Sequence, residues 1–186
     1  MLSFLSSFFL IAIAEMGDKT QLVALSFATK YKPIKVLLGI FIGTLVIHLF
    51  SVIIGEKVSA LIPMHYLKIL IGISFIGFGI WTLKGDTCNG KGKKDNKLGA
   101  IATVAIAFFL AELGDKTQLA TISLAAQYHS FMGVWLGSTF GMVAADGIAI
   151  IVGIIAGKKL PEKLIKYIST SIFILFGTII IIDAIR

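Results

Sequence analysis

Glu15-Met16-Gly17-Asp18-Lys19-Thr20-Gln21-Leu22 recurs 97 residues later as Glu112-Leu113-Gly114-Asp115-Lys116-Thr117-Gln118-Leu119, with seven of the eight residues identical. We call residues 15–22 the first motif and residues 112–119 the second motif. After a one-residue slip the correspondence continues at an offset of 98. It matches Gly39 with Gly137, Gly43 with Gly141 and Pro63 with Pro161. The chain is therefore a duplication in which each copy carries one acidic motif.

The composition excludes an ordinary soluble protein. Of the 186 residues 57% are hydrophobic and 15% are charged, and the mean hydropathy is +0.96. With its 19 glycines the chain is about two thirds apolar, against roughly 45–50% in soluble domains. A domain of this size cannot hide so much apolar surface from water. We therefore expect an integral membrane protein.

Apolar runs between polar breaks predict an all-α membrane fold with six transmembrane helices, three in each repeat. The expected helices are 3–28, 34–54, 64–83, 99–126, 131–156 and 162–184. The chain thus divides into repeat 1 at 1–84, a flexible basic linker at 85–98 and repeat 2 at 99–186. An odd number of helices per repeat turns the second copy upside down in the bilayer, as in many secondary transporters.

Lysine placement predicts the orientation in the membrane. The connections after the first, third and fifth expected helices carry 12 lysines, whereas the opposite side has only Lys57, Lys68 and Arg186. Positively charged loops stay in the cytoplasm. We therefore expect both termini outside, in a bacterial-type plasma membrane. This distribution also explains the net charge of +7 without any nucleic-acid partner.

Four carboxylates fall at bilayer depth, where each charge costs at least about 2.5 kcal/mol and marks a pathway. They belong to Glu15, Asp18, Glu112 and Asp115. On a continuous helix the glutamate, the aspartate and the glutamine three residues further on share one face. If the motifs face each other, their oxygens form a hard site for Mg²⁺, Ca²⁺ or Mn²⁺. Neither motif contains a cysteine or a histidine for a softer metal. The candidate supporting ligands are Gln21, Gln118, Thr20 and Thr117.

Lys19 and Lys116 lie four residues after the glutamates and can balance their charge. Four carboxylates and two lysines leave a charge of −2, which one divalent cation cancels. The same carboxylates can take up protons when the cation leaves, which would couple the two in antiport. The alternative is that the acids only form buried salt bridges and that the threonines bond their own helix backbone.

The duplicated Glu-x-Gly-Asp-Lys-Thr signature resembles the family of the Golgi transmembrane protein 165 and the bacterial manganese exporters, proposed cation/proton exchangers for Mn²⁺ and Ca²⁺. The similarity covers nearly the whole chain. The resemblance implies that Glu15, Asp18, Glu112 and Asp115 are the cation ligands. It implies an exporter of divalent cations, most of all Mn²⁺, in exchange for H⁺ by alternating access.

Two further titratable residues, His48 and Asp146, occupy equivalent repeat positions inside apolar runs, so we expect both to be buried. They are candidate proton relays, or else locally satisfied polar groups. The glycine pairs at 39/43 and 137/141 are expected to permit close helix packing. Neither an enzyme active site nor an ATP-binding loop is expected, and no resident cofactor. A cation channel and an exporter of small organic cations such as amino acids remain alternative functions, and the oligomeric state stays open.

Overall fold

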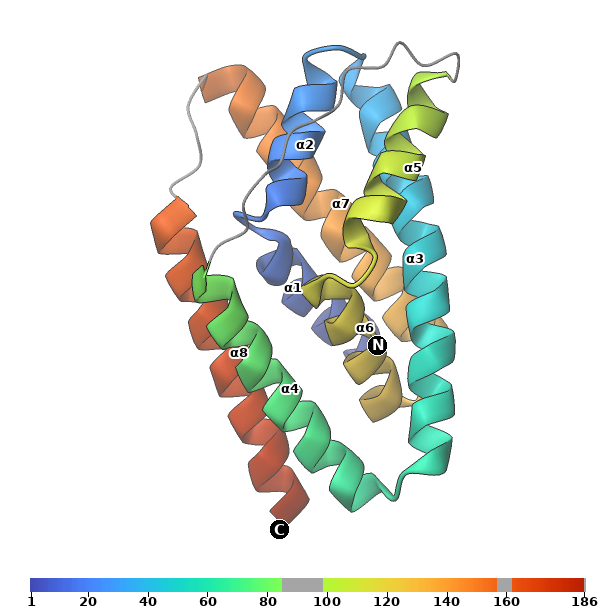
Figure 1. Ribbon diagram of the computed structural model, residues 1–186, viewed down its shortest axis with the longest axis vertical. Coiled ribbons are helices and arrows are strands. Elements are labelled where there is room, and N and C mark those ends of the chain that lie inside the picture. Colours follow the sequence, from blue (N-terminus) through green and yellow to red (C-terminus); the bar gives the residue numbers. More distant parts are fainter. Residues whose placement is uncertain (85–98, 157–161, 186) are drawn as a thin grey trace.

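The computed structural model describes residues 1–84, 99–156 and 162–185, and all regular secondary structure in them is helical (Figure 1). The predicted linker at 85–98 lies outside these residues. The helices are α1 (Leu2–Glu15), α2 (Lys19–Ala28), α3 (Pro33–Leu61), α4 (Met64–Lys84), α5 (Ala100–Glu112), α6 (Lys116–Tyr128), α7 (Phe131–Ala156) and α8 (Glu162–Ile185).

The predicted continuous helices at 3–28 and 99–126 are wrong, because each is broken at its motif. The first is α1 followed by α2, and the second is α5 followed by α6. The expected helix at 34–54 extends to Leu61 as α3, since the residues beyond Phe50 remain mostly apolar. The other predicted helices agree with α4, α7 and α8 to within about one residue.

Each half of the chain packs mainly on the other half. Helix α1 lies on α7, and its counterpart α5 lies on α3, while α4 and α8 form a pair. Equivalent helices run in opposite directions: in Figure 1, α3 descends through the molecule and α7 ascends, and α4 ascends while α8 descends. The two copies are therefore interlocked rather than standing as separate bundles.

Glycines allow the closest of these contacts. A Cβ atom added at Gly43 of α3 would lie 2.5 Å from the carbonyl oxygen of Ala105 in α5. At Gly141 of α7 it would lie 2.4 Å from the carbonyl oxygen of Phe8 in α1. The two contacts are equivalent in the two repeats. The predicted packing role of these glycines is confirmed, because any side chain would force the helix backbones apart.

Two apolar clusters fill the interior. The first, which we call the lower cluster, includes Leu10 and Ala14 of α1, Leu124 of α6, and residues of α4 and α8. The second, which we call the upper cluster, includes Ala24 of α2 and Phe108 of α5. At the first motif the chain passes from the lower cluster to the upper one, and at the second motif it passes back. Both motifs therefore lie where the two clusters meet.

The outer faces are apolar as well. A row on α3 is exposed, and similar residues line α7 and α8. The row on α3 consists of Leu38, Ile42, Val46, Phe50 and Ile53. Helices α3 (Pro33–Leu61) and α7 over Phe131–Ile154 are long and apolar enough to cross a bilayer, and shorter apolar helices accompany them. Side chains that would be unfavourable in water are suited to lipid.

Candidate functional site

Each motif forms a tight turn between two helices. Met16 has φ −62° and ψ 123°, Gly17 has φ 78°, and the amide of Asp18 donates to the carbonyl of Glu15 at 3.1 Å. These values describe a type II turn, which requires a positive φ at its third residue. The second motif repeats it, with Gly114 at φ 75°. A Cβ atom added at Gly114 would meet nothing within 4 Å, so lack of space does not explain this glycine. Its positive φ does.

The motif glutamines brace these turns. The side-chain oxygen of Gln21 accepts the amide of Gly17 at 2.7 Å, and that of Gln118 accepts the amide of Gly114 at 2.6 Å. The amide nitrogen of Gln21 also donates to the carbonyl of Ala145 in α7 at 3.0 Å. Both glutamine oxygens are therefore engaged in holding the turns. Their role as cation ligands stays a prediction.

The motif threonines bond to the glutamates. The hydroxyl of Thr20 donates to a carboxylate oxygen of Glu15, and that of Thr117 donates to Glu112. Each bond spans the turn from the start of one helix to the end of the preceding helix. The alternative that these hydroxyls bond only their own helix backbone does not describe the structure. The threonines instead orient one oxygen of each glutamate.

An ion pair joins the two motifs. The ammonium of Lys116 in the second motif contacts Asp18 in the first motif, and both side chains are buried. The pairing of a lysine with the glutamate four residues earlier assumed an unbroken helix. The turn removes that geometry, and Lys116 reaches across the repeat boundary instead. The side chain of Lys19 lies outside the described residues.

The four motif carboxylates are closed off from the surroundings. Glu15 and Glu112 are 0% exposed, and Asp18 and Asp115 are 3% and 4% exposed. They are near enough to repel one another, and Glu15 interacts electrostatically with Glu112 of the other motif. Among the described residues, one oxygen of Glu15 and one of Glu112 have no hydrogen-bond partner. Buried oxygens of this kind are costly unless a proton or a cation satisfies them.

The donor set fits a hard divalent cation, because it consists of carboxylate and hydroxyl oxygens. Within the described parts of the chain, however, no three histidine, cysteine, aspartate or glutamate side chains are arranged to hold a metal ion. Lys116 lies against Asp18 in this conformation. A cation bound by these carboxylates would therefore require them to converge further.

His48 and Asp146 are both fully buried, in α3 and α7 respectively. The Nδ1 atom of His48 lies 3.4 Å from the hydroxyl of Thr139, whereas neither oxygen of Asp146 has a hydrogen-bond partner in the described residues. Asp146 interacts electrostatically with Asp18. The Ala145 carbonyl, which accepts the Gln21 amide, was not predicted from the sequence. Every residue type has a backbone carbonyl, so residue identity does not reveal such an acceptor.

Comparison with known proteins places these features in context. A family model described as divalent cation/proton antiporter GDT1 matches residues 3–89 and 100–186. A Vibrio cholerae protein named "Putative manganese exporter" is 36% identical over 169 residues, covering 90% of this chain and 84% of that protein. GDT1-like protein 1, chloroplastic, of Oryza sativa subsp. japonica is 30% identical, covering 98% of this chain and 62% of its own length. Protein PAM71, chloroplastic, of Arabidopsis thaliana is 30% identical and is covered over 56% of its length. No solved structure matches the chain.

Proposed function

This chain belongs to the GDT1 family of divalent cation/proton antiporters, and we propose that it exports a divalent cation from the cytoplasm in exchange for protons, with Mn²⁺ as the leading candidate and Ca²⁺ as the second. The family resemblance drawn from the duplicated motif is confirmed. The observation that carries the finer proposal is the meeting of both acidic motifs in a closed interior, joined by the pair of Lys116 with Asp18.

The proposed mechanism is alternating access between two inverted repeats of three membrane crossings each. Three observations support it: equivalent helices run in opposite directions, the copies interlock through equivalent glycine contacts, and the motifs lie between two apolar clusters. Rocking of one repeat against the other would open either cluster in turn. The discontinuous helices at the motifs are the form that transport sites commonly take.

In this proposal Glu15, Asp18, Glu112 and Asp115 bind the cation, and Lys116 balances part of their charge when the cation is absent. Thr20 and Thr117 set the orientation of the glutamates. Lys19 would balance charge in the equivalent position. Asp146 and His48 are the proposed proton relays, because both are titratable and fully buried, and Asp146 interacts electrostatically with Asp18. The cation is the transported substrate, and no resident cofactor is invoked.

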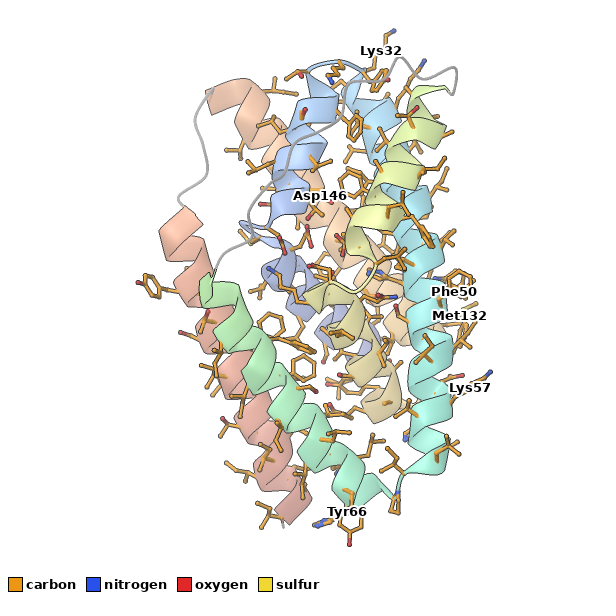
Figure 2. The ribbon with its side chains drawn as sticks, viewed as in Figure 1. Lys32, Phe50, Lys57, Tyr66, Met132 and Asp146 are labelled. Atoms are coloured by element: carbon orange, nitrogen blue, oxygen red, sulfur yellow. The ribbon has the colours of Figure 1, made fainter. Side chains whose placement is uncertain are left out.

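We propose that the end of the molecule carrying Lys30, Lys32 and Lys35 faces the cytoplasm, which leaves both termini outside. Figure 2 shows Lys32 at one end of the helices and Tyr66 at the opposite end. The sequence analysis counted further lysines on this side, but their side chains are not among those that the structure describes. A bacterial-type plasma membrane remains the proposed location, although the rice and Arabidopsis relatives are named as chloroplastic.

The test is Mn²⁺ flux in proteoliposomes under an imposed pH gradient, with Ca²⁺ as competitor. Wild-type protein should move Mn²⁺ against its gradient, and Glu15→Gln and Asp115→Asn should abolish this movement. Asp183→Asn is a matched control, because that carboxylate is exposed and pairs with Lys68 at the surface. Flux that ignores the pH gradient would favour a channel. Transport of an organic cation such as lysine in place of Mn²⁺ would favour the third alternative.

A further inference from the structure

Asp146 breaks the equivalence of the two repeats in the buried interior of the molecule. The repeat offset of 98 places it opposite His48, and both residues are fully buried in equivalent helices, α7 and α3. One position thus carries a carboxylate and the other an imidazole. If these two positions line a cation site built from the two repeats, its ligands must differ between the two sides.

The two side chains also differ in their contacts. The His48 ring is near the Thr139 hydroxyl at 3.4 Å, so one of its nitrogens has a neighbour across the interface of α3 and α7. Both oxygens of Asp146 lack a hydrogen-bond partner within residues 1–84, 99–156 and 162–185. Burying an ionisable carboxylate in this way costs several kcal/mol unless another group compensates it. Packing alone therefore gives no reason for an aspartate here.

Asp146 lies next in the chain to a residue that contacts the first motif. The preceding residue, Ala145, accepts a hydrogen bond from the amide of Gln21, which ties α7 to the start of α2. Asp146 interacts electrostatically with Asp18 and with both motif glutamates. Figure 2 shows it inside the bundle, between the ends marked by Lys32 and Tyr66.

The described residues show no equivalent connection on the side of the second motif. The amide oxygen of Gln118 accepts the amide of Gly114, but no bond from the Gln118 nitrogen to α3 is found in the described chain. Gln118 is also partly exposed, whereas Gln21 is buried. The half of the site next to the first motif is therefore the more closed and the more acidic.

We propose that Asp146 is a fifth carboxylate ligand of the transported divalent cation, on the side of the first motif, with Glu15 and Asp18. This inference rests on the proposed function. An additional carboxylate makes the site more negative, and oxygen sites bind divalent cations more tightly when their ligands carry more negative charge. His48 gives the second side one acidic ligand fewer, so the cation binds off centre.

The test is equilibrium binding of Mn²⁺ to the purified full chain, followed by the electron paramagnetic resonance signal of free Mn²⁺. Asp146→Asn should weaken Mn²⁺ binding about tenfold or more, because affinity in oxygen sites depends on ligand charge. Asp146→Glu should recover most of the binding. His48→Asn should change it less than about threefold, and Asp183→Asn should leave it unchanged.

The outcomes separate the inference from its alternatives. Loss of binding in Asp146→Asn, with recovery in Asp146→Glu and an unchanged melting temperature, supports a ligand. Wild-type affinity in Asp146→Asn overturns it, even if proton coupling changes. An equal loss in both variants with lowered melting temperatures indicates a packing role and also overturns it. If wild type binds Mn²⁺ but shows no proton-coupled flux, the proposed antiport fails while the ligand assignment stands.

Discussion

Replacing Lys116 with methionine tests whether its ammonium stands in for the cation. The ammonium contacts Asp18, and the two side chains are 5% and 0% exposed, respectively. Methionine keeps much of the volume of lysine but removes the charge. The Asp18 carboxylate then loses its positive neighbour while it remains buried.

The expected cost is large because the pair is buried. Removing one partner of a buried ion pair destabilises a protein by about 3–5 kcal/mol. For a chain of this length about 3 kcal/mol corresponds to a melting temperature lower by roughly 6–12 °C. The double variant Lys116→Met with Asp18→Asn should lose much less, about 1 kcal/mol, because no buried charge is left without its counterion.

Added Mn²⁺ should reverse the effect of the single variant. A cation present at a hundred times its dissociation constant stabilises the folded state by about 2.7 kcal/mol. In the wild type it must first displace the ammonium, so its stabilisation should be smaller than in Lys116→Met. Thermal melting of the purified protein with increasing Mn²⁺ measures both effects, with Asp183→Asn as the control for a surface charge.

The reasoning fails if Lys116→Met melts at the wild-type temperature without cation. It also fails if Mn²⁺ stabilises the two proteins equally, since the ammonium and the cation would then not compete. A double variant no more stable than the single one would show that the loss comes from packing of the lysine chain.

Other substitutions test the fold and the turns. Gly43→Ala should lower stability by about 1–3 kcal/mol, because its Cβ would lie 2.5 Å from the Ala105 oxygen; Gly77→Ala, which meets nothing within 4 Å, should not lower the melting temperature. Gly114→Ala should cost about 1–2 kcal/mol through its positive φ alone and slow Mn²⁺ flux, with Gly114→Asn less impaired. Thr117→Val should weaken Mn²⁺ binding by releasing Glu112, and Thr117→Ser should retain it; equal affinity of the two variants would exclude a role for this hydroxyl.

Helix positions were predictable from the sequence, and the breaks within two helices were not. The apolar runs that became α4, α7 and α8 are long enough to define helices by themselves. The four residues from Glu15 to Asp18 are a short break in a longer apolar run, so the hydropathy pattern did not predict a turn there. The glycine in each motif was the available signal, because it adopts the positive φ found there without steric cost.

The burial of His48 and Asp146 was predicted and is confirmed, since both lie inside apolar helices. The partner of Lys116 was not predicted correctly. Its own glutamate is close only in an unbroken helix, and Asp18 is 98 residues away in the chain. Contacts of this separation depend on how helices from the two halves pack, which residue spacing within one half does not encode.

The sequence by itself determined the duplication, the membrane environment and the acidic chemistry, because repetition, hydropathy and residue type are properties of the chain. Only the tertiary structure decided that the helices break at the motifs, that Lys116 meets the opposite aspartate and that Asp146 lies beside the first motif. The physical reason is that glycine contacts interlock the two halves. Lys116 and Asp146 therefore find Asp18 in the other copy.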